Sequence, residues 1–245
     1  MKSLSNIIEH KLRLIKHIYL RPEEEMSWLK SLNYKFDISI DAGANRGYIS
    51  HVLSKKSNVV ISIEPIDYLS KYLKSVLSKN CSVINAAASD VEGHSIIRIP
   101  LDKNGNDISA LSSIEESNNF KDSHEVESYR EININKISID DLIKNNYQDR
   151  KVDFIKIDVE GHEETLLAGA KDCINTFKPI VLIEIEKRHG SSLSSIFSFF
   201  KRMGYESYAV KNRKLIRYSL DEFKFSQSNF EVGNNNYVSD IVFKF

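Results

Sequence analysis

Apolar segments of strand length alternate with helical segments along most of this chain, and this alternation limits the fold more than any other feature. We expect strands at 36–41, 58–63, 81–86, 152–158, 179–185, 205–210 and 237–244, and helices at 47–56, 66–79, 138–146, 162–176 and 191–203. Strands that alternate with helices form a mostly parallel sheet with helices on both faces. The last segment alternates apolar and polar residues, so we expect an antiparallel strand at one edge. The predicted class is α/β.

Two parts of the chain depart from this alternation. Residues 1–35 have a helical pattern, so the predicted organisation is an N-terminal helical segment followed by one domain at 36–245. Within that domain, 94–136 contains two alternating stretches, which predict an inserted β-hairpin. Its connection, 102–130, is polar and longer than ordinary loops. Such a connection is either a lid over a functional site or a disordered segment, and the sequence does not decide between them.

The charge balance excludes some kinds of partner. The chain has 34 Lys and Arg residues and 34 Asp and Glu residues, so we expect neither a nucleic-acid partner nor a membrane surface. No apolar run approaches the ~20 residues that span a bilayer, and no secretion signal is visible. The two cysteines lie far apart in sequence and match no metal spacing. We therefore expect buried thiols and a cytoplasmic protein. The basic run at 211–214 is interpreted as a solvated turn.

The stretch K-V-D-F-I-K-I-D-V-E-G-H-E-E brings candidate catalytic residues to the end of one strand. A strand this apolar is normally buried in a parallel sheet, where an ionised carboxylate is costly unless it has a partner or a function. An acidic helix N-terminus would explain Glu163 and Glu164, but it would not explain Asp158 and Glu160. We therefore predict Asp158, Glu160 and His162 as catalytic residues.

Lys156 lies in the middle of the same strand. An unpaired buried lysine would lose its charge, so we expect an ion pair with Asp41 or Asp158. This role would be structural.

A glycine-containing turn follows the first expected strand, in I-S-I-D-A-G-A-N-R-G. Gly43 and Gly47 allow a tight turn and close approach of a ligand to the backbone. A dinucleotide fold has G-x-G-x-x-G at this point and binds a pyrophosphate. Here the spacing is G-x-x-x-G, and Asp41 would repel a phosphate. A positively charged ligand such as S-adenosylmethionine suits Asp41 better.

Two further strand ends carry carboxylates in the expected order. Glu64 ends the second strand, where a carboxylate can accept hydrogen bonds from both ribose hydroxyls. Asp90 follows the third strand in N-A-A-A-S-D, where small residues leave room for an adenine and Asp90 can accept its exocyclic amine. Three acidic strand ends in order are more specific than a single glycine turn.

Together, D-A-G-A-N-R-G, I-E-P, N-A-A-A-S-D, I-S-I-D-D-L and V-D-F-I-K-I-D-V-E-G-H-E resemble the FkbM family of S-adenosylmethionine-dependent methyltransferases. The resemblance covers roughly residues 36–188. It implies the Rossmann-like class I methyltransferase fold, with a seven-stranded sheet in the order 3-2-1-4-5-7-6 and an antiparallel last strand. It also implies O-methylation of hydroxyls on sugars or natural products. By position, the cofactor-binding residues would be Asp41, Gly43, Asn45 and Gly47 for the methionine end, Glu64 for the ribose and Asp90 for the adenine.

Two mechanisms could activate an acceptor hydroxyl at these strand ends. In the first, His162 or Asp158 removes its proton directly. In the second, Asp158 with Glu184 or Glu160 holds Mg²⁺, which lowers the pKa of the hydroxyl. We favour the first mechanism, because the resemblance alone does not establish a metal.

The predicted function is S-adenosylmethionine-dependent O-methylation of a sugar hydroxyl in a glycan, glycolipid or secondary metabolite. The partner would therefore be a small-molecule or glycan acceptor. Two alternatives are a nicotinamide-dependent oxidoreductase on a related fold and a nucleotide-binding protein without catalysis.

Overall fold

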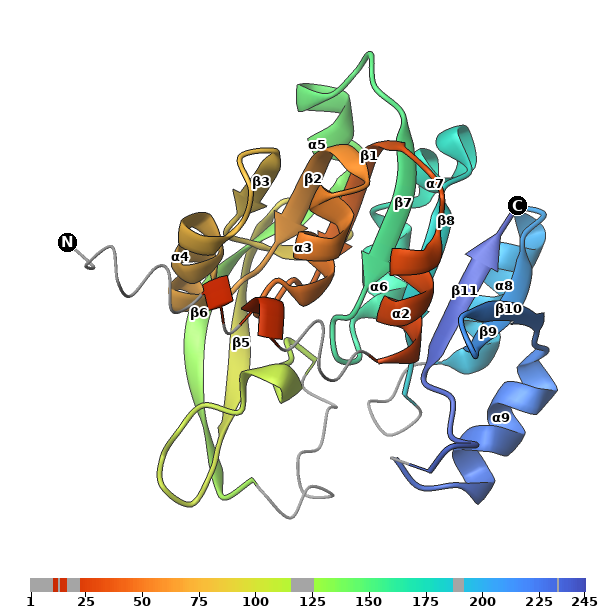
Figure 1. Cartoon of the computed structure of the whole chain (residues 1–245). Helices are drawn as coiled ribbons and strands as arrows, with labels where there is room; N and C mark the ends of the chain where they lie inside the picture. Colours follow the sequence, from red (N-terminus) through yellow and green to blue (C-terminus); the bar gives the residue numbers. More distant parts are fainter. Residues whose placement is uncertain (1–10, 13, 17–22, 116–125, 187–191, 233) are drawn as a thin grey trace.

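The computed structural model describes residues 11–12, 14–16, 23–115, 126–186, 192–232 and 234–245. Its centre is an eight-stranded sheet in the order β10-β9-β11-β8-β7-β1-β2-β3 (Figure 1). The strands are β1 (Phe36–Ala42), β2 (Ser57–Ile63), β3 (Cys81–Ile84), β7 (Val152–Ile157), β8 (Ile180–Glu184), β9 (Glu206–Lys211), β10 (Lys214–Arg217) and β11 (Asp240–Lys244). The α/β prediction is confirmed, and the expected strands all have counterparts here.

The sheet has one strand more than the seven expected. From β3 to β8 the pairs are all parallel, whereas β11 runs antiparallel to both β8 and β9. Those seven strands follow the order that the resemblance implied, and β10 adds an eighth through its antiparallel pairing with β9. The turn is only Asn212 and Arg213, both with positive φ, as a two-residue hairpin requires. The basic run therefore contains a turn but also the start of β10, which the sequence interpretation missed.

Side chains alternate between the two faces of this sheet, as the strand period requires. Ile155 and Ile157 of β7 face one hydrophobic cluster, whereas Phe154 of the same strand faces another. Helices within residues 139–229 contribute to the first cluster, and helices within residues 24–54 contribute to the second. Helices therefore cover both faces (Figure 1). They are α2 (Glu24–Ser31), α3 (Tyr48–Ser54), α4 (Asp67–Val76), α5 (Ile139–Asn146), α6 (Glu163–Ala168), α7 (Lys171–Phe177), α8 (Leu193–Arg202) and α9 (Leu220–Asn229).

The helix expected at 162–176 is divided into α6 and α7. The division falls at Gly169, where a Cβ would lie 2.1 Å from the carbonyl oxygen of Ser89. This close approach holds the helix pair against β4 (Ala87–Ser89) and explains why a glycine stands there. Helix α9 was not expected. Of the N-terminal helical segment expected at 1–35, much lies outside the described residues, and the described part includes α2.

A second, three-stranded sheet lies beside the first, in the order β4-β6-β5. β5 (Gly93–Leu101) and β6 (Ser128–Ser138) pair antiparallel, but β6 also pairs in parallel with β4. The expected insertion is therefore part of a small mixed sheet and not an isolated hairpin. In the connection between β5 and β6, residues up to 115 are described and include the 3-10 helix η1 (Ser109–Leu111), whereas 116–125 lie outside the described residues.

In the part of the chain that the structure describes, no helix is long and apolar enough to cross a membrane.

Candidate functional site

An open cavity of about 1480 Å³ lies at the carboxyl ends of the central parallel strands. One part, which we call the glycine half, is lined from β1, β2, β4 and η1 and from the loops that follow them. The other part, which we call the acidic half, is lined from the start of α2, the ends of β7 and β8, and the start of β11. The two halves adjoin because β1 and β7 are neighbours in the sheet. Ligands of open α/β sheets bind at this position.

The turn after β1 is shaped by residues with positive φ. Gly43 has φ +83°, and a Cβ at this position would lie 1.7 Å from the carbonyl oxygen of Asp158. No side chain fits there, so the glycine allows the ends of β1 and β7 to meet. Gly47 has φ +79° and precedes α3, where a Cβ would lie 2.6 Å from a methyl carbon of Leu73. Packing against backbone thus requires Gly43, whereas Gly47 is favoured mainly by its positive φ.

Asn45 lies between these glycines with φ +44° and lines the cavity. Its side-chain oxygen is buried and accepts no hydrogen bond from the described atoms. A buried acceptor without a donor is costly, and a ligand that brings an N–H or O–H group would satisfy it.

Asp41 lies at the base of the glycine half and is 2% exposed. Ser50 of α3 donates a hydrogen bond of 2.5 Å to its Oδ2, and Ser50 is also 2.7 Å from the Ser62 hydroxyl. Burial raises the pKa of Asp41, although the Ser50 hydrogen bond and the charge of Lys156 oppose that shift. The carboxyl group is therefore held in place by the protein before any ligand binds.

Glu64 follows β2 and is also buried in the wall of the cavity. Its two carboxylate oxygens each accept a backbone hydrogen bond of 2.8 Å, one from Asn45 and one from Ile66. Burial raises its pKa to about 7, and the two backbone hydrogen bonds oppose the shift. Its position links the glycine turn to the end of β2.

Asp90 does not join this group of residues. Its side chain is 43% exposed and is not part of the cavity lining. Ser89 donates a hydrogen bond of 3.0 Å to it, the Val91 N–H donates one of 2.9 Å, and Lys136 lies 3.4 Å away. The hydrogen bond from Ser89, together with the charge of Lys136 and the hydrogen bond from Val91, outweighs the opposing effect of burial and lowers the pKa of Asp90.

Apolar side chains line the cavity near the position expected for Asp90. They come from the end of β2, from β4 and from β5: Ile66, Ala87, Ala88 and Ile97. The expected small residues Ala87 and Ala88 are therefore present, and Ile66 and Ile97 are cavity residues that the sequence analysis missed.

The three candidate catalytic residues all line the cavity. Glu160 has φ +49°, and its carbonyl oxygen accepts a hydrogen bond of 2.6 Å from the Ser113 hydroxyl. His162 is 6% exposed, with Nε2 lying 3.0 Å from the Ser89 hydroxyl and Nδ1 lying 2.5 Å from Glu115. Both ring nitrogens of His162 thus have protein partners. Ser113 and Glu115, from the connection after β5, were not expected at the site.

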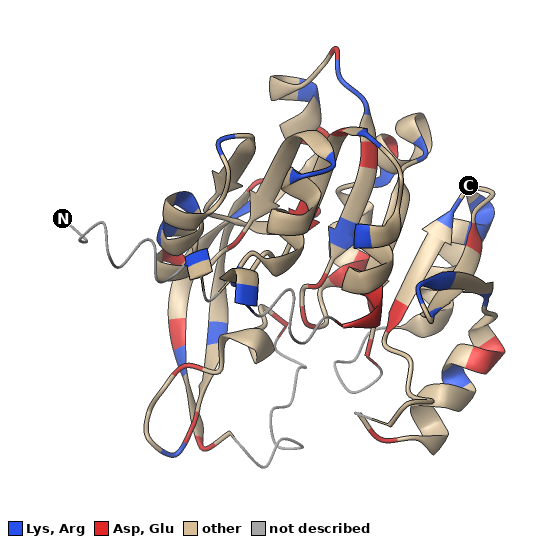
Figure 2. Ribbon diagram, in the orientation of Figure 1, with Lys and Arg blue, Asp and Glu red and all other residues tan. Residues whose placement is uncertain are grey.

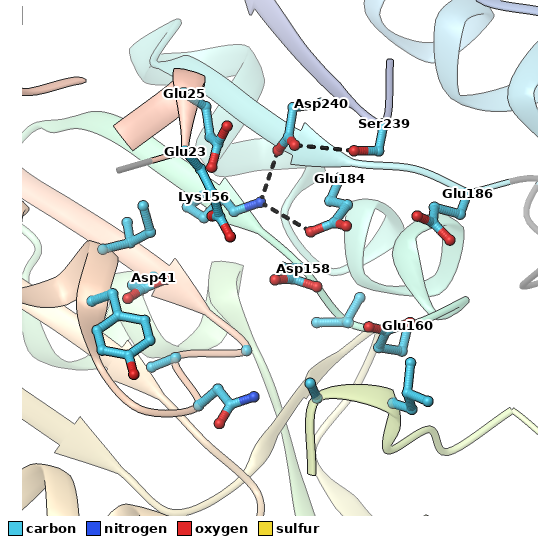
Figure 3. Close-up of a pocket in the computed structure, with 18 of the residues that line it drawn as sticks. Glu23, Glu25, Asp41, Lys156, Asp158, Glu160, Glu184, Glu186, Ser239 and Asp240 are labelled. Carbon is cyan, nitrogen blue, oxygen red and sulfur yellow. Dashed lines mark hydrogen bonds and ion pairs between the residues drawn. The ribbon is translucent and has the colours of Figure 1, made fainter. Parts of the chain in front are cut away.

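Lys156 is paired differently from the expectation. Its ammonium lies 3.2 Å from Asp240 and 3.8 Å from Glu184 (Figure 3). Asp240 is the first residue of β11 and pairs with Glu184 in the antiparallel register, so β11 supplies the nearer carboxylate partner of Lys156. The expected pairing with Asp41 or Asp158 is wrong for direct contact, although the charges of Asp240, Asp158 and Glu184 together raise the pKa of Lys156 against its burial.

The carboxyl groups around Lys156 repel one another. The charge of Asp158 and burial raise the pKa of Glu184, while burial and then the charges of Glu160 and Asp240 raise that of Asp158. The charge of Lys156 opposes both shifts but does not cancel them. Burial and the charge of Asp240 likewise raise the pKa of Glu25. The acidic half therefore retains protons that isolated carboxylates would release.

Residues 41–207 match the family profile described as the Methyltransferase FkbM domain, which is most of the chain. The chain belongs to the FkbM methyltransferase family. The resemblance of the sequence motifs to this family is therefore confirmed.

One solved structure shows the same fold. The FkbM methyltransferase from Methylobacillus flagellatus KT is 17% identical, with a TM-score of 0.50. The match covers 94% of this chain and 52% of that one, so this chain spans about half the length of that protein. More distant matches include a putative methyltransferase from Streptococcus mutans in complex with SAH, which is 10% identical over 89% of this chain and 94% of that one (TM-score 0.45). A SAM-dependent methyltransferase from Aquifex aeolicus is 12% identical over 100% of this chain and 98% of that one (TM-score 0.43). No curated protein matches the sequence.

The donor set of this FkbM family member does not fit the expected Mg²⁺ site. Among the described residues, no group of three or more potential ligands is placed to hold a metal. Glu184, one of the expected ligands, instead lies beside the ammonium of Lys156, which already supplies a cation at this point. Magnesium is therefore not supported at this site.

The glycine half does fit S-adenosylmethionine. The unsatisfied oxygen of Asn45 and the carboxyl group of Asp41 are suited to an ammonium and a sulfonium, and Glu64 is suited to hydroxyl donors. Gly43 lines the cavity, whereas Gly47 is not part of its lining and contributes to the turn only through its positive φ.

Proposed function

We propose that this protein is an S-adenosylmethionine-dependent O-methyltransferase acting on a sugar hydroxyl of a glycan, glycolipid or secondary metabolite. The observation that carries the proposal is the junction of the two halves, where Gly43 meets the carbonyl of Asp158. A donor bound against the glycine turn would present its methyl group beside the carboxylates that follow β7. Alignment of donor and acceptor supplies much of the catalysis in such a displacement.

In the donor site, Asp41 and Asn45 would hold the methionine end, and Glu64 would hold the ribose hydroxyls. Ala87, Ala88 and Ile97 would surround the adenine, since they line the adjoining wall. Asp90 lies outside this wall and would not contact the adenine directly. S-adenosylmethionine supplies a methyl group already activated by its sulfonium.

In the acceptor site, Asp158 is better placed than His162 to accept the hydroxyl proton. The pKa of Asp158 is raised to about 7, and a general base works best when its pKa lies near the working pH. The ring nitrogens of His162 are engaged by Ser89 and Glu115, so His162 is suited to positioning the loop. Glu160 adds negative charge beside Asp158 and raises its proton affinity further.

The first test is isothermal titration with S-adenosylmethionine and S-adenosylhomocysteine, with NAD as the control. We expect binding of both methionine ligands, and a loss of about tenfold or more in Glu64→Gln, because a charge-assisted hydrogen bond to ribose is removed. Binding of NAD alone would favour an oxidoreductase and refute the proposal.

The second test separates the two candidate bases. Methyl transfer to a panel of sugars should fall by about 10²-fold or more in Asp158→Asn. His162→Gln, which can still hydrogen-bond to Ser89, should retain much more activity. The reverse ranking would assign the base to His162.

A further inference from the structure

The lining of the cavity carries far more negative than positive residues, although the chain as a whole is balanced. Its acidic residues are Glu23, Glu24, Glu25, Asp41, Glu64, Asp107, Asp158, Glu160, Glu184, Glu186 and Asp240, and its basic residues are Arg46, Lys156 and Lys211. In the acidic half, the start of α2, the ends of β7 and β8 and the start of β11 bring their carboxylates to one place (Figures 2 and 3). The imbalance is therefore local to this site.

S-adenosylmethionine would not correct this imbalance. Its sulfonium and ammonium carry two positive charges and its carboxylate carries one negative charge, so it adds one net positive charge. That charge would lie in the glycine half, beside Asp41 and Asn45. The volume of about 1480 Å³ exceeds the roughly 300–1,000 Å³ of ordinary ligand pockets, which leaves room for a second ligand in the acidic half.

The protein already binds one alkylammonium in this half, that of its own Lys156. The group is 6% exposed and lies between Asp240 at 3.2 Å and Glu184 at 3.8 Å. Glu186 extends beyond Glu184 from the same segment and also lines the cavity. The geometry of the half thus accommodates an ammonium among carboxylates.

Protons are the other means of reducing the repulsion. The raised pKa values of Glu25 and Glu184 mean that these groups hold protons when the site contains no additional cation. A second cation would replace those protons, because opposite charge favours the ionised carboxylate. Binding of a cation would therefore release protons to the solvent.

We propose that the acceptor is an amine-bearing alcohol of the amino-sugar type, whose ammonium binds in the acidic half while its hydroxyl faces Asp158. This rests on the proposed function and names its substrate class. In the transfer, the hydroxyl proton passes to Asp158, the oxygen forms the new bond to carbon, and the carbon–sulfur bond breaks with its electrons retained by sulfur. The amine stays protonated among carboxylates, so its lone pair is not available and methylation is directed to oxygen.

The experiment compares two probes with the same sugar backbone, the glucosamine tetramer and the N-acetylglucosamine tetramer. Each is titrated calorimetrically into protein saturated with S-adenosylhomocysteine, in phosphate and in Tris, and spermidine serves as a compact polyamine probe. We expect the amine probes to bind about tenfold or more tightly than the acetylated tetramer. The heats in the two buffers should differ because protons are released. Affinity should fall between low and high salt, because ions screen the partly exposed charges.

Two variants locate the effect. Glu186→Gln should weaken binding of the amine probes about tenfold and leave S-adenosylhomocysteine binding unchanged. Glu92→Gln removes an exposed carboxylate that is not in the cavity lining and should change neither. Equal binding of both tetramers, or failure of both amine probes to bind, overturns the inference while the proposed function stands. Failure of S-adenosylhomocysteine to bind would refute the proposed function, and titration of the free protein with the amine probes would still test the acidic half.

Discussion

Glu64 should make the stability of the ligand-free protein fall as the pH rises. Its pKa is 4.5 as an ordinary side chain and about 7 in the folded protein, mainly because it is buried. The folded state therefore binds the proton more strongly, so its stabilising contribution is complete below pH 4.5 and is lost as the pH rises to about 7. Integrating this linkage between pH 5 and pH 8 gives a loss of about 2.5 kcal/mol from this group alone.

Glu64→Gln removes the titration while keeping the shape of the side chain. The free energy of unfolding, measured by urea denaturation at pH 5 and pH 8, should change by about 2.5 kcal/mol less in the variant than in the wild type. Other buried carboxyl groups contribute equally to both proteins and cancel in this difference. Glu92→Gln, at an exposed position, should keep the wild-type difference. If Glu64→Gln also keeps it, Glu64 does not titrate as its burial requires, and the reasoning is wrong.

Two further predictions concern packing. Gly43→Ala should destabilise the protein by about 3 kcal/mol or more, because the new Cβ overlaps the carbonyl of Asp158 and φ is positive. Gly105→Ala is the control: φ is +75° but no atom lies near the new Cβ, so it should cost only about 1 kcal/mol. Equal costs in urea denaturation would show that the contact is not the cause. Phe200→Ala should cost about 3–5 kcal/mol because this ring is fully buried, whereas Phe225→Ala, 61% exposed, should stay within about 0.5 kcal/mol. A similar loss in both variants would contradict the burial argument.

The sequence predicted the central strands well because each carries a strong local signal. Short apolar runs marked β1, β2, β7 and β8, and the carboxyl ends of parallel strands meet at one edge of the sheet. This is why Asp41, Glu64 and Asp158 could be assigned to one edge before the structure was known. Helix boundaries were harder to predict where tertiary packing determines them. The apolar pattern predicted one continuous helix at 162–176, but the close approach of Gly169 to Ser89 divides it in two.

The rest of the site depends on tertiary contacts that leave no local pattern. Lys156 pairs with Asp240 because β11 inserts between β8 and β9 in one particular register. The sequence shows a strand there but not that register. Ser113 and Glu115 lie in a polar stretch without periodicity, so their contacts with the loop after β7 could not be expected. Asp90 had the expected spacing, but its side chain is held at the surface by Lys136.

The connection from β5 to β6 contributes η1 to the wall of the cavity while its two ends are held in an antiparallel pair. Closing a flexible loop becomes only about 0.6 kcal/mol more costly when its length doubles. This connection can therefore gain or lose many residues with little effect on the stability of the central sheet. Under the proposed function, insertions and deletions here would change the range of acceptor sizes, whereas the glycine turn proposed to bind the methyl donor need not change with them.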